Sequence, residues 1–348
     1  MKKNILIAVL VGALALLTVS MTFGQTTDVP TTEKRAQTGM KFLSVSLDAR
    51  ASAMGNTMTS QDQVTSMAMF YNPAALGWLK NNVNVALGQT QWIVDFNYYY
   101  GAVAIRPADG AYGVFGLNVV SVDYGEFDET IRDGASATGY RELGKFSPSA
   151  YSVGLGYAFA VSDRFTFGGN VKYVHEDLGA STLRLQGTSV QREENNAGVL
   201  AFDFGIIYKT GFKSLNFGMT ARNFAEDVTY AQESFELPLT FRIGLSMDLV
   251  DLTSMDKNKH SFLLSVDTER PRDFDEHVNI GGEYVFSNVV ALRGGYSLGA
   301  GDDTEESASF GGGIKTKLGS QGSLKVDYSY TSFGVFDNVN RFTFSFGF

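Results

Sequence analysis

The last eight residues, Arg341-Phe342-Thr343-Phe344-Ser345-Phe346-Gly347-Phe348, decide the fold class of this chain. Phenylalanine occupies every second position, and the residues between are polar or small. Because successive side chains of a β-strand point to opposite faces, the stretch predicts a strand with one aromatic and one polar face. In a soluble sandwich the aromatic face packs into the core. In an outer-membrane barrel it faces lipid, and the polar face lines the lumen.

The same alternation recurs upstream, and its length favours the membrane interpretation. It is clear over residues 151–159, 215–222, 239–249 and 324–330. Several predicted strands exceed ten residues, which is long for a soluble strand and close to the tilted span of a bilayer. The composition fits lipid-facing alternation, with 38 Gly, 27 Phe, 16 Tyr and a mean hydropathy of -0.04. Beyond the amino terminus no apolar run is long enough for a membrane-spanning helix, so a membrane-embedded chain must form a closed barrel.

The sequence predicts about fourteen antiparallel strands in an all-β transmembrane barrel over residues 82–348. The predicted strands begin near Val83, Tyr98, Tyr112, Ser149, Phe165, Ala197, Leu215, Leu237, Ser261, Val278, Val289, Ala308, Ser323 and Val339. Short connections alternate with longer ones at 125–146, 179–196, 224–235 and 299–306, although 251–259 is longer than this rule expects. Short periplasmic turns and long extracellular loops are typical of outer-membrane barrels.

The amino terminus predicts export. Residues 1–24 have a basic start, a short apolar core and small residues at the exit, which indicates a cleaved signal peptide; a membrane-anchoring helix is the alternative. Residues 25–41 are polar and predict a flexible periplasmic segment. The chain has no Cys, so neither lipoprotein anchoring nor disulfides are expected, and its formal net charge of -9 disfavours nucleic acid as a partner.

Residues 42–80 lack the alternation of apolar and polar residues that marks the predicted strands after them. Small residues run through 49–55, and Val64–Phe70 predicts a short helix that ends before Asn72-Pro73, because proline cannot continue a helix. The stretches 42–56 and 69–76 resemble the PorV/PorQ family of the FadL-like group of fourteen-stranded barrels, and the Asn-Pro-Ala element is shared with that wider group. The resemblance implies that residues 42–80 form a plug or hatch inside the barrel. The implied plug motif comprises Arg50, Met54, Gly55, Asn72, Pro73 and Ala74.

Three residues are candidate contacts for the lumen or for a ligand: Arg50, Trp92 and Arg293. Arg50 is expected to pair with an acidic wall residue, either as a structural tether or in gating and ligand capture. Trp92 opens an aromatic stretch that ends at Tyr100, which indicates an interfacial girdle or, alternatively, a funnel for an apolar ligand.

Enzymatic and metal chemistry are not expected. Residues 295–299, Gly-Tyr-Ser-Leu-Gly, match the nucleophile-elbow pattern, but a strand that runs into a loop lacks the helix this motif needs. His175, His260 and His277 are far apart and are expected at loops or strand ends rather than in a zinc site or a triad. Acidic clusters at 273–276 and 302–306 lack calcium-loop spacing and are expected to be solvated, with weak cation or lipopolysaccharide contact as the alternative. No cofactor is predicted.

Two functions follow from the resemblance. PorV-like barrels help to receive and attach cargo in type IX secretion, which implies secretion-system proteins or secreted cargo as partners. FadL-like barrels carry hydrophobic small molecules, which implies an apolar ligand. A plain scaffold or adhesin is a third class without specific support. Each of these three functions places the chain in the outer membrane of a Gram-negative cell, in contact with the lipids of that membrane.

Overall fold

The computed structural model describes residues 38–186, 189–230, 233–299, 308–319, 322–334, 336 and 338–348. The predicted signal peptide, residues 1–24, and most of the predicted periplasmic segment lie outside the described residues. Fourteen antiparallel strands close into one barrel, in which β1 pairs with β18, so the predicted fold class is confirmed. The barrel strands are β1 (Val83–Gln91), β2 (Asn97–Ile105), β3 (Val114–Asp123), β6 (Ser149–Ala160), β7 (Phe165–Gln186), β8 (Ser189–Lys209), β9 (Asn216–Ala225), β12 (Thr240–Asp248), β13 (His260–Pro271), β14 (His277–Phe286), β15 (Val290–Gly299), β16 (Ala308–Leu318), β17 (Gly322–Thr331) and β18 (Val339–Gly347).

In the final strand, β18, the alternating residues divide between the outer and the inner face of the barrel. Phe342 and Phe344 are 43% and 38% exposed on the outer face, whereas Arg341 and Thr343 between them are buried inside. Other strands repeat this arrangement, so the outer wall is a band of aromatic and aliphatic side chains and the interior is polar. The barrel therefore presents its apolar surface outward, as a membrane requires. No helix among the described residues is long and apolar enough to span a membrane.

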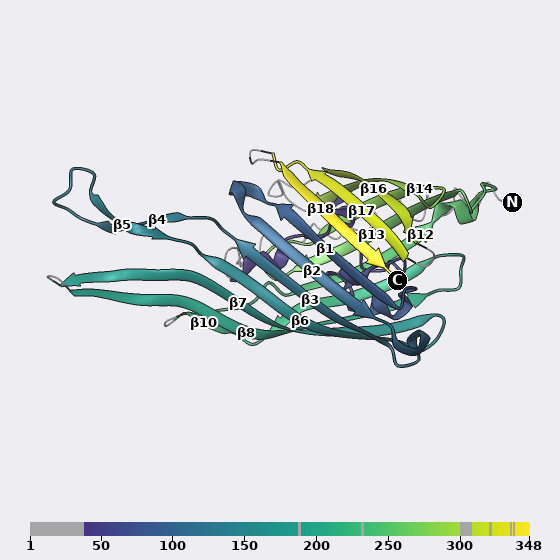
Figure 1. The fold of residues 1–348 in the computed structure, drawn as a ribbon, viewed down its shortest axis with the longest axis horizontal. Coiled ribbons are helices and arrows are strands. Elements are labelled where there is room, and N and C mark those ends of the chain that lie inside the picture. The colour runs from purple at the N-terminus through teal and green to yellow at the C-terminus, as the bar shows by residue number, and fades with distance from the viewer. Residues whose placement is uncertain are drawn as a thin grey trace, which may run out of the picture.

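One rim of the barrel is much taller than the other (Figure 1). The hairpin of β4 (Phe127–Arg132) and β5 (Tyr140–Phe146) projects beyond the barrel beside the long ends of β7 and β8, and β10 (Val228–Tyr230) pairs with β11 (Glu233–Phe235). These segments fall in stretches that the sequence predicts as long loops, so that prediction is wrong in detail: much of their length is paired strand. We call this end of the barrel the long-loop rim.

A helical segment precedes the first strand. It contains η1 (Lys41–Ser44), α2 (Ala49–Ala53), η2 (Ser66–Phe70) and η3 (Pro73–Trp78), and we call residues 38–80 the inner segment. Asp48 caps α2, Thr65 caps η2 and Asn72 caps η3, each by accepting a hydrogen bond from a backbone N–H in the first turn. Most of its side chains are buried, and its helices contact inward-facing residues of many barrel strands.

Three short helical turns lie in the connections between barrel strands. The turns at the opposite rim carry η5 (Pro107–Gly110) and η6 (Leu249–Leu252), and η4 (Ile93–Asp95) lies between β1 and β2 at the long-loop rim. The Gly-Tyr-Ser-Leu-Gly stretch lies in β15, where residues 295–299 are strand throughout. Ser297 therefore lies within a strand and not at the sharp turn that a nucleophile elbow requires.

Candidate functional site

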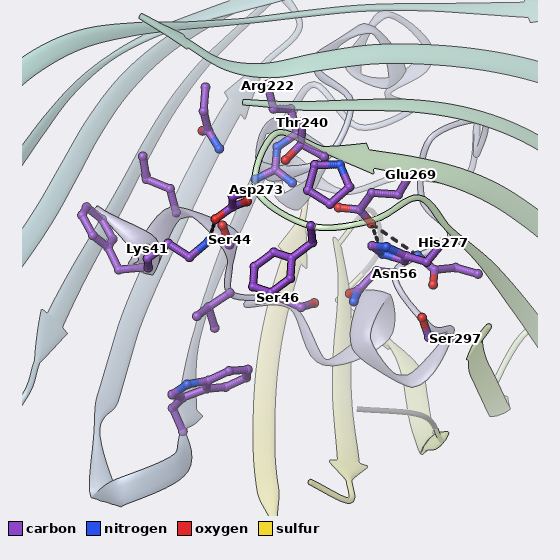
Figure 2. A pocket seen from close by; sticks show the side chains of 18 of the residues that line it. Lys41, Ser44, Ser46, Asn56, Arg222, Thr240, Glu269, Asp273, His277 and Ser297 are labelled. Carbon is purple, nitrogen blue, oxygen red and sulfur yellow. Dashed lines mark hydrogen bonds and ion pairs between the residues drawn. The ribbon is translucent and has the colours of Figure 1, made fainter. Parts of the chain in front are cut away.

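A cavity of about 760 Å³ opens within the barrel at the long-loop rim (Figure 2). Residues 39–46 of the inner segment form one side of it, and the ends of the strands form the rest. We call this cavity the vestibule. Its volume lies in the range of roughly 300–1,000 Å³ that is usual for sites that hold a small ligand.

One arc of the vestibule wall is charged. Arg242 on β12 donates from Nη2 to Glu269 Oε1 on β13 at 2.7 Å, and His277 Nε2 on β14 lies 3.1 Å from Glu269 Oε2. The strand register places Arg242 opposite Glu269, and Glu269 opposite His277, so the three side chains form one row across neighbouring strands. Arg242 also donates from Nη1 to the carbonyl of Asn56 at 3.0 Å, which ties this row to the inner segment.

The start of the inner segment is held at the same rim. Lys41 forms an ion pair with Asp273, and the Thr38 hydroxyl donates to the same carboxylate at 2.5 Å. The Lys41 ammonium also lies 4.8 Å from the centre of the Phe274 ring. Residues 38–41, the described end of the stretch predicted as a flexible periplasmic segment, thus form specific contacts with the connection between β13 and β14 at the long-loop rim.

The opposite arc is aromatic. Trp92 packs edge-on against Phe333 and Tyr98, with ring centroids 4.9 Å and 6.3 Å apart, and Phe96 packs on Tyr124 at 5.0 Å. These residues belong to β1, β2, β3 and β17 or their loops, on the far side of the barrel from β9, β12 and β13. Trp92 therefore lines the vestibule, as a funnel for an apolar ligand would require.

A tyrosine pair closes the wall near β7. The hydroxyls of Tyr124 and Tyr230 both donate to the Glu176 carboxylate at 3.3 Å. Burial, helped by the Glu176 carboxylate, raises the pKa of Tyr230 above its usual value, so this hydroxyl keeps its proton and remains a donor. Because Tyr230 belongs to β10, the contact ties the small β10–β11 sheet to β7 beside the vestibule wall.

Arg50 and Arg293, the other two predicted contacts, meet in a buried network instead of lining the vestibule. Arg50 donates to both carboxylate oxygens of Glu283 at 3.0 and 2.7 Å, and its Nη1 donates to the Gln63 carbonyl at 2.9 Å. Arg293 Nε binds the same Glu283 at 2.5 Å, and its Nη1 lies 2.8 Å from Asp327. Glu283 thus bridges an arginine of the inner segment and an arginine of the wall.

The other predicted motif residues also touch the wall. The Asn72 amide donates to the carbonyl of Thr59 at 2.6 Å and to that of Ile206 on β8 at 3.2 Å, while its oxygen caps the helix that starts at Pro73 and Ala74. Met54 is fully buried. A Cβ on Gly295 of β15 would lie 2.0 Å from the Gly55 nitrogen, so glycine is needed for this close approach.

The sequence did not single out Arg222, Arg242 or Glu269, and it placed His277 at a strand end without a partner. Two features of the sequence could have identified them: their polar, inward-facing positions in the alternating strands and their closeness to long connections. Among the described residues no group of three or more His, Cys, Asp or Glu is arranged to hold a metal ion.

Comparison with solved structures shows what the fold is similar to. The toluene transporter TbuX of Ralstonia pickettii superposes with a TM-score of 0.56 at 15% identity, over 86% of this chain and 97% of that one. The toluene transporter TodX of Pseudomonas putida gives 0.55 at 13%, over 86% and 96%, and the monoaromatic hydrocarbon channel CymD gives 0.55 at 13%, over 87% and 98%. At these identities the likeness shows the fold alone, and it agrees with the predicted antiparallel β-barrel.

Comparison with curated sequences finds no match. The family model described as type IX secretion system membrane protein PorP/SprF matches residues 54–348. The PorV/PorQ resemblance of the sequence thus led to the correct secretion system, although the matching model is that of PorP/SprF. Since this match spans well over half of the chain, the protein belongs to the PorP/SprF family of type IX secretion system membrane proteins.

Proposed function

We propose that the protein is an outer-membrane component of type IX secretion that holds a protein partner at its long-loop rim. The partner is either secreted cargo or another protein of the secretion system, the role that the resemblance to PorV/PorQ barrels implied. The observation that carries this proposal is the rim itself. Paired strands extend it far beyond the barrel, and the Glu129 carboxylate on β4 accepts hydrogen bonds from Thr182 at 2.6 Å and Arg192 at 3.3 Å, which joins the two hairpins.

In this proposal the inner segment is a structural plug. Beyond the vestibule, two cavities against it measure about 30 Å³ and 10 Å³, room for only about one or two water molecules each. Arg50 and Asn72 anchor the segment to β14 and β8. A vestibule that ends on such a segment favours retention of a partner over passage of a solute, and it favours a tethering role for Arg50.

The test removes the hairpin and spares the barrel. Residues 127–146 are replaced by a short Gly-Ser linker, and surface display of type IX cargo is measured in cells by protease accessibility. We expect cargo display to fall strongly, with normal amounts of heat-modifiable barrel in the outer membrane. A matched variant shortens the opposite-rim connection at 251–259 and should display cargo normally. Unchanged display after hairpin removal contradicts the proposal.

A second candidate function is uptake of hydrophobic small molecules. The aromatic arc around Trp92 and the likeness of the fold to hydrocarbon channels favour it. Uptake of labelled toluene into proteoliposomes tests this candidate. Transport requires the inner segment to move, so a variant that removes one of its anchors, Arg50→Ala, should raise the uptake rate. Uptake no faster than in protein-free vesicles, for both proteins, excludes this function for toluene.

A further inference from the structure

A β-bulge at the end of β9 turns two consecutive side chains into the barrel. Arg222 and Asn223 together oppose the single residue Asp203 on β8, because the β8–β9 register shifts between Phe202 and Phe204. Both residues line the vestibule, while Phe224 beyond them is exposed on the outer face. Asn223 adopts a φ of 62°, a left-handed conformation that asparagine accepts more readily than most residues. Bulges of this kind re-aim side chains next to functional sites.

The hydrogen bonds around the bulge leave Arg222 without a directly bonded carboxylate. Asp203 accepts from Lys172 Nζ at 2.8 and 2.9 Å, from the Asn170 amide at 2.9 Å and from the Asn223 backbone N–H at 2.8 Å. Lys172 therefore neutralises Asp203. Arg222 makes no hydrogen bond or ion pair with any described residue. The Tyr71 ring lies 5.8 Å from its Cζ, and the carboxylates of Asp203 and Glu269 act on its charge only from beyond ion-pair distance.

Most other charges of the vestibule wall are already matched, and the remaining carboxylate, that of Asp275, is exposed to solvent. Arg242 pairs with Glu269, which also contacts His277, and Lys41 pairs with Asp273. Glu176 accepts two tyrosine hydroxyls. The Arg222 guanidinium points toward the cavity (Figure 2). Its strand, β9, lies across the barrel from β1, the strand that Trp92 follows. A guanidinium without a carboxylate is suited to a carboxylate supplied by a ligand, which it can bind through two parallel hydrogen bonds.

We propose that the vestibule binds a carboxylate carried on an aromatic or apolar body, with the carboxylate at Arg222 and the body against the aromatic arc. Two sources offer this chemistry: a free aromatic acid, or the carboxyl-terminal residue of a polypeptide. The inference rests on the proposed function only in treating the vestibule as a binding site.

The test is isothermal titration calorimetry on the purified full chain in detergent micelles. The probes are 3-phenylpropanoate with its neutral amide, and acetyl-Gly-Gly-Phe as free acid with its carboxamide. We expect at least one acid to bind roughly 10- to 100-fold more tightly than its amide, as a hydrogen-bonded charged pair provides. The Arg222→Gln variant should lose this acid preference, Arg222→Lys should keep part of it, and Trp92→Ala should weaken acid and amide alike.

The outcomes distinguish a free aromatic acid from a polypeptide terminus as the ligand, and they distinguish failure of this inference from failure of the proposed function. Preference for the small acid alone assigns a free aromatic acid, and preference for the peptide acid assigns a polypeptide terminus. Equal binding or no binding of acid and amide by the wild-type protein overturns the inference, as does a folded Arg222→Gln variant that retains the preference. If Arg222→Gln does not fold, the acid and amide comparison on wild-type and Arg222→Lys proteins decides. Because binding is measured without cells, its failure is distinct from unchanged cargo display after hairpin removal.

Discussion

The Arg50 guanidinium donates to both oxygens of the Glu283 carboxylate, from Nε at 3.0 Å and from Nη2 at 2.7 Å, and so joins helix α2 to strand β14. Both side chains are about 7% exposed. A charge pair with so little water around it contributes little net stability while it is intact, but loss of one partner leaves a buried charge without compensation.

Replacement of Arg50 should therefore destabilise the fold. We expect Arg50→Gln to lower the free energy of unfolding by about 3 kcal/mol, near the low end for broken buried pairs, because Arg293 still contacts Glu283. The measurement is urea unfolding in lipid vesicles, followed by tryptophan fluorescence. The control, Lys145→Gln, breaks an exposed pair with Glu126 and should leave the curve unchanged. Equal midpoints for Arg50→Gln and the wild type would show that the pair is not a tether.

The contact between Asn72 and β8 predicts a steric effect. A Cβ on Gly205 would lie 1.9 Å from Asn72 Oδ1, which also accepts the Ala74 N–H. We expect Gly205→Ala to destabilise the barrel by about 1–3 kcal/mol, since one of the two groups must shift. The control is Gly169→Ala on β7, whose nearest atom would be 3.4 Å away. If both variants unfold at the same urea concentration, the inner segment does not pack on β8 as described.

Loosening both anchors should open the barrel to ions. The variant Arg50→Gln/Asn72→Ala removes the link to β14 and the hydrogen bonds to the Thr59 and Ile206 carbonyls. Because a fourteen-stranded wall encloses more space than its own side chains fill, release of the inner segment leaves a water-filled path. Planar-bilayer recordings should show open events in this variant and rare or brief ones in the wild type. Large, steady conductance of the wild type would contradict a plug.

The lipid contact of the outer wall is testable on the last strand. Phe344 points outward between Leu87 and Val326 of the neighbouring strands. We expect Phe344→Arg to cost about 2–4 kcal/mol if it lies near the bilayer midplane, because a cation must then leave water. Refolding into vesicles at graded urea measures this cost. Tyr140→Arg on the projecting β5 strand, which is 46% exposed, serves as the control and should refold as the wild type does.

The sequence predicted the barrel strands well because the bilayer imposes a local pattern. Most strands begin within about three residues of their predicted starts, since apolar side chains alternate wherever a strand meets lipid. The exception is β8, which begins at Ser189 and not near Ala197. Its first residues extend beyond the barrel and need no apolar face. The same reason explains why β4, β5, β10 and β11 were predicted as loops.

The vestibule was harder to predict because its residues meet through the closed barrel. Arg242 and Glu269 lie opposite each other only in one register of the β12–β13 hairpin. The connection at 251–259 is too long and irregular for that register to be predicted from the sequence. The partner of Arg50 depends on how the inner segment sits, and no local pattern encodes that. The bulge that exposes Arg222 is a single shift in an otherwise regular alternation, so it has no signature in the residue types around it.

The Glu129 carboxylate offers a test of the rim as a rigid unit. It joins β4 to Thr182 on β7 and Arg192 on β8, whereas within the two hairpins the strands are held by their own backbone pairing. Glu129→Ala should therefore free the β4–β5 hairpin without unfolding the barrel. We expect faster hydrogen exchange over residues 127–146, unchanged exchange over β12–β15, and reduced display of cargo. The matched variant Glu142→Ala, on the exposed strand β5, should alter none of these. Faster exchange with full cargo display would separate hairpin rigidity from partner binding and would leave the vestibule as the remaining contact.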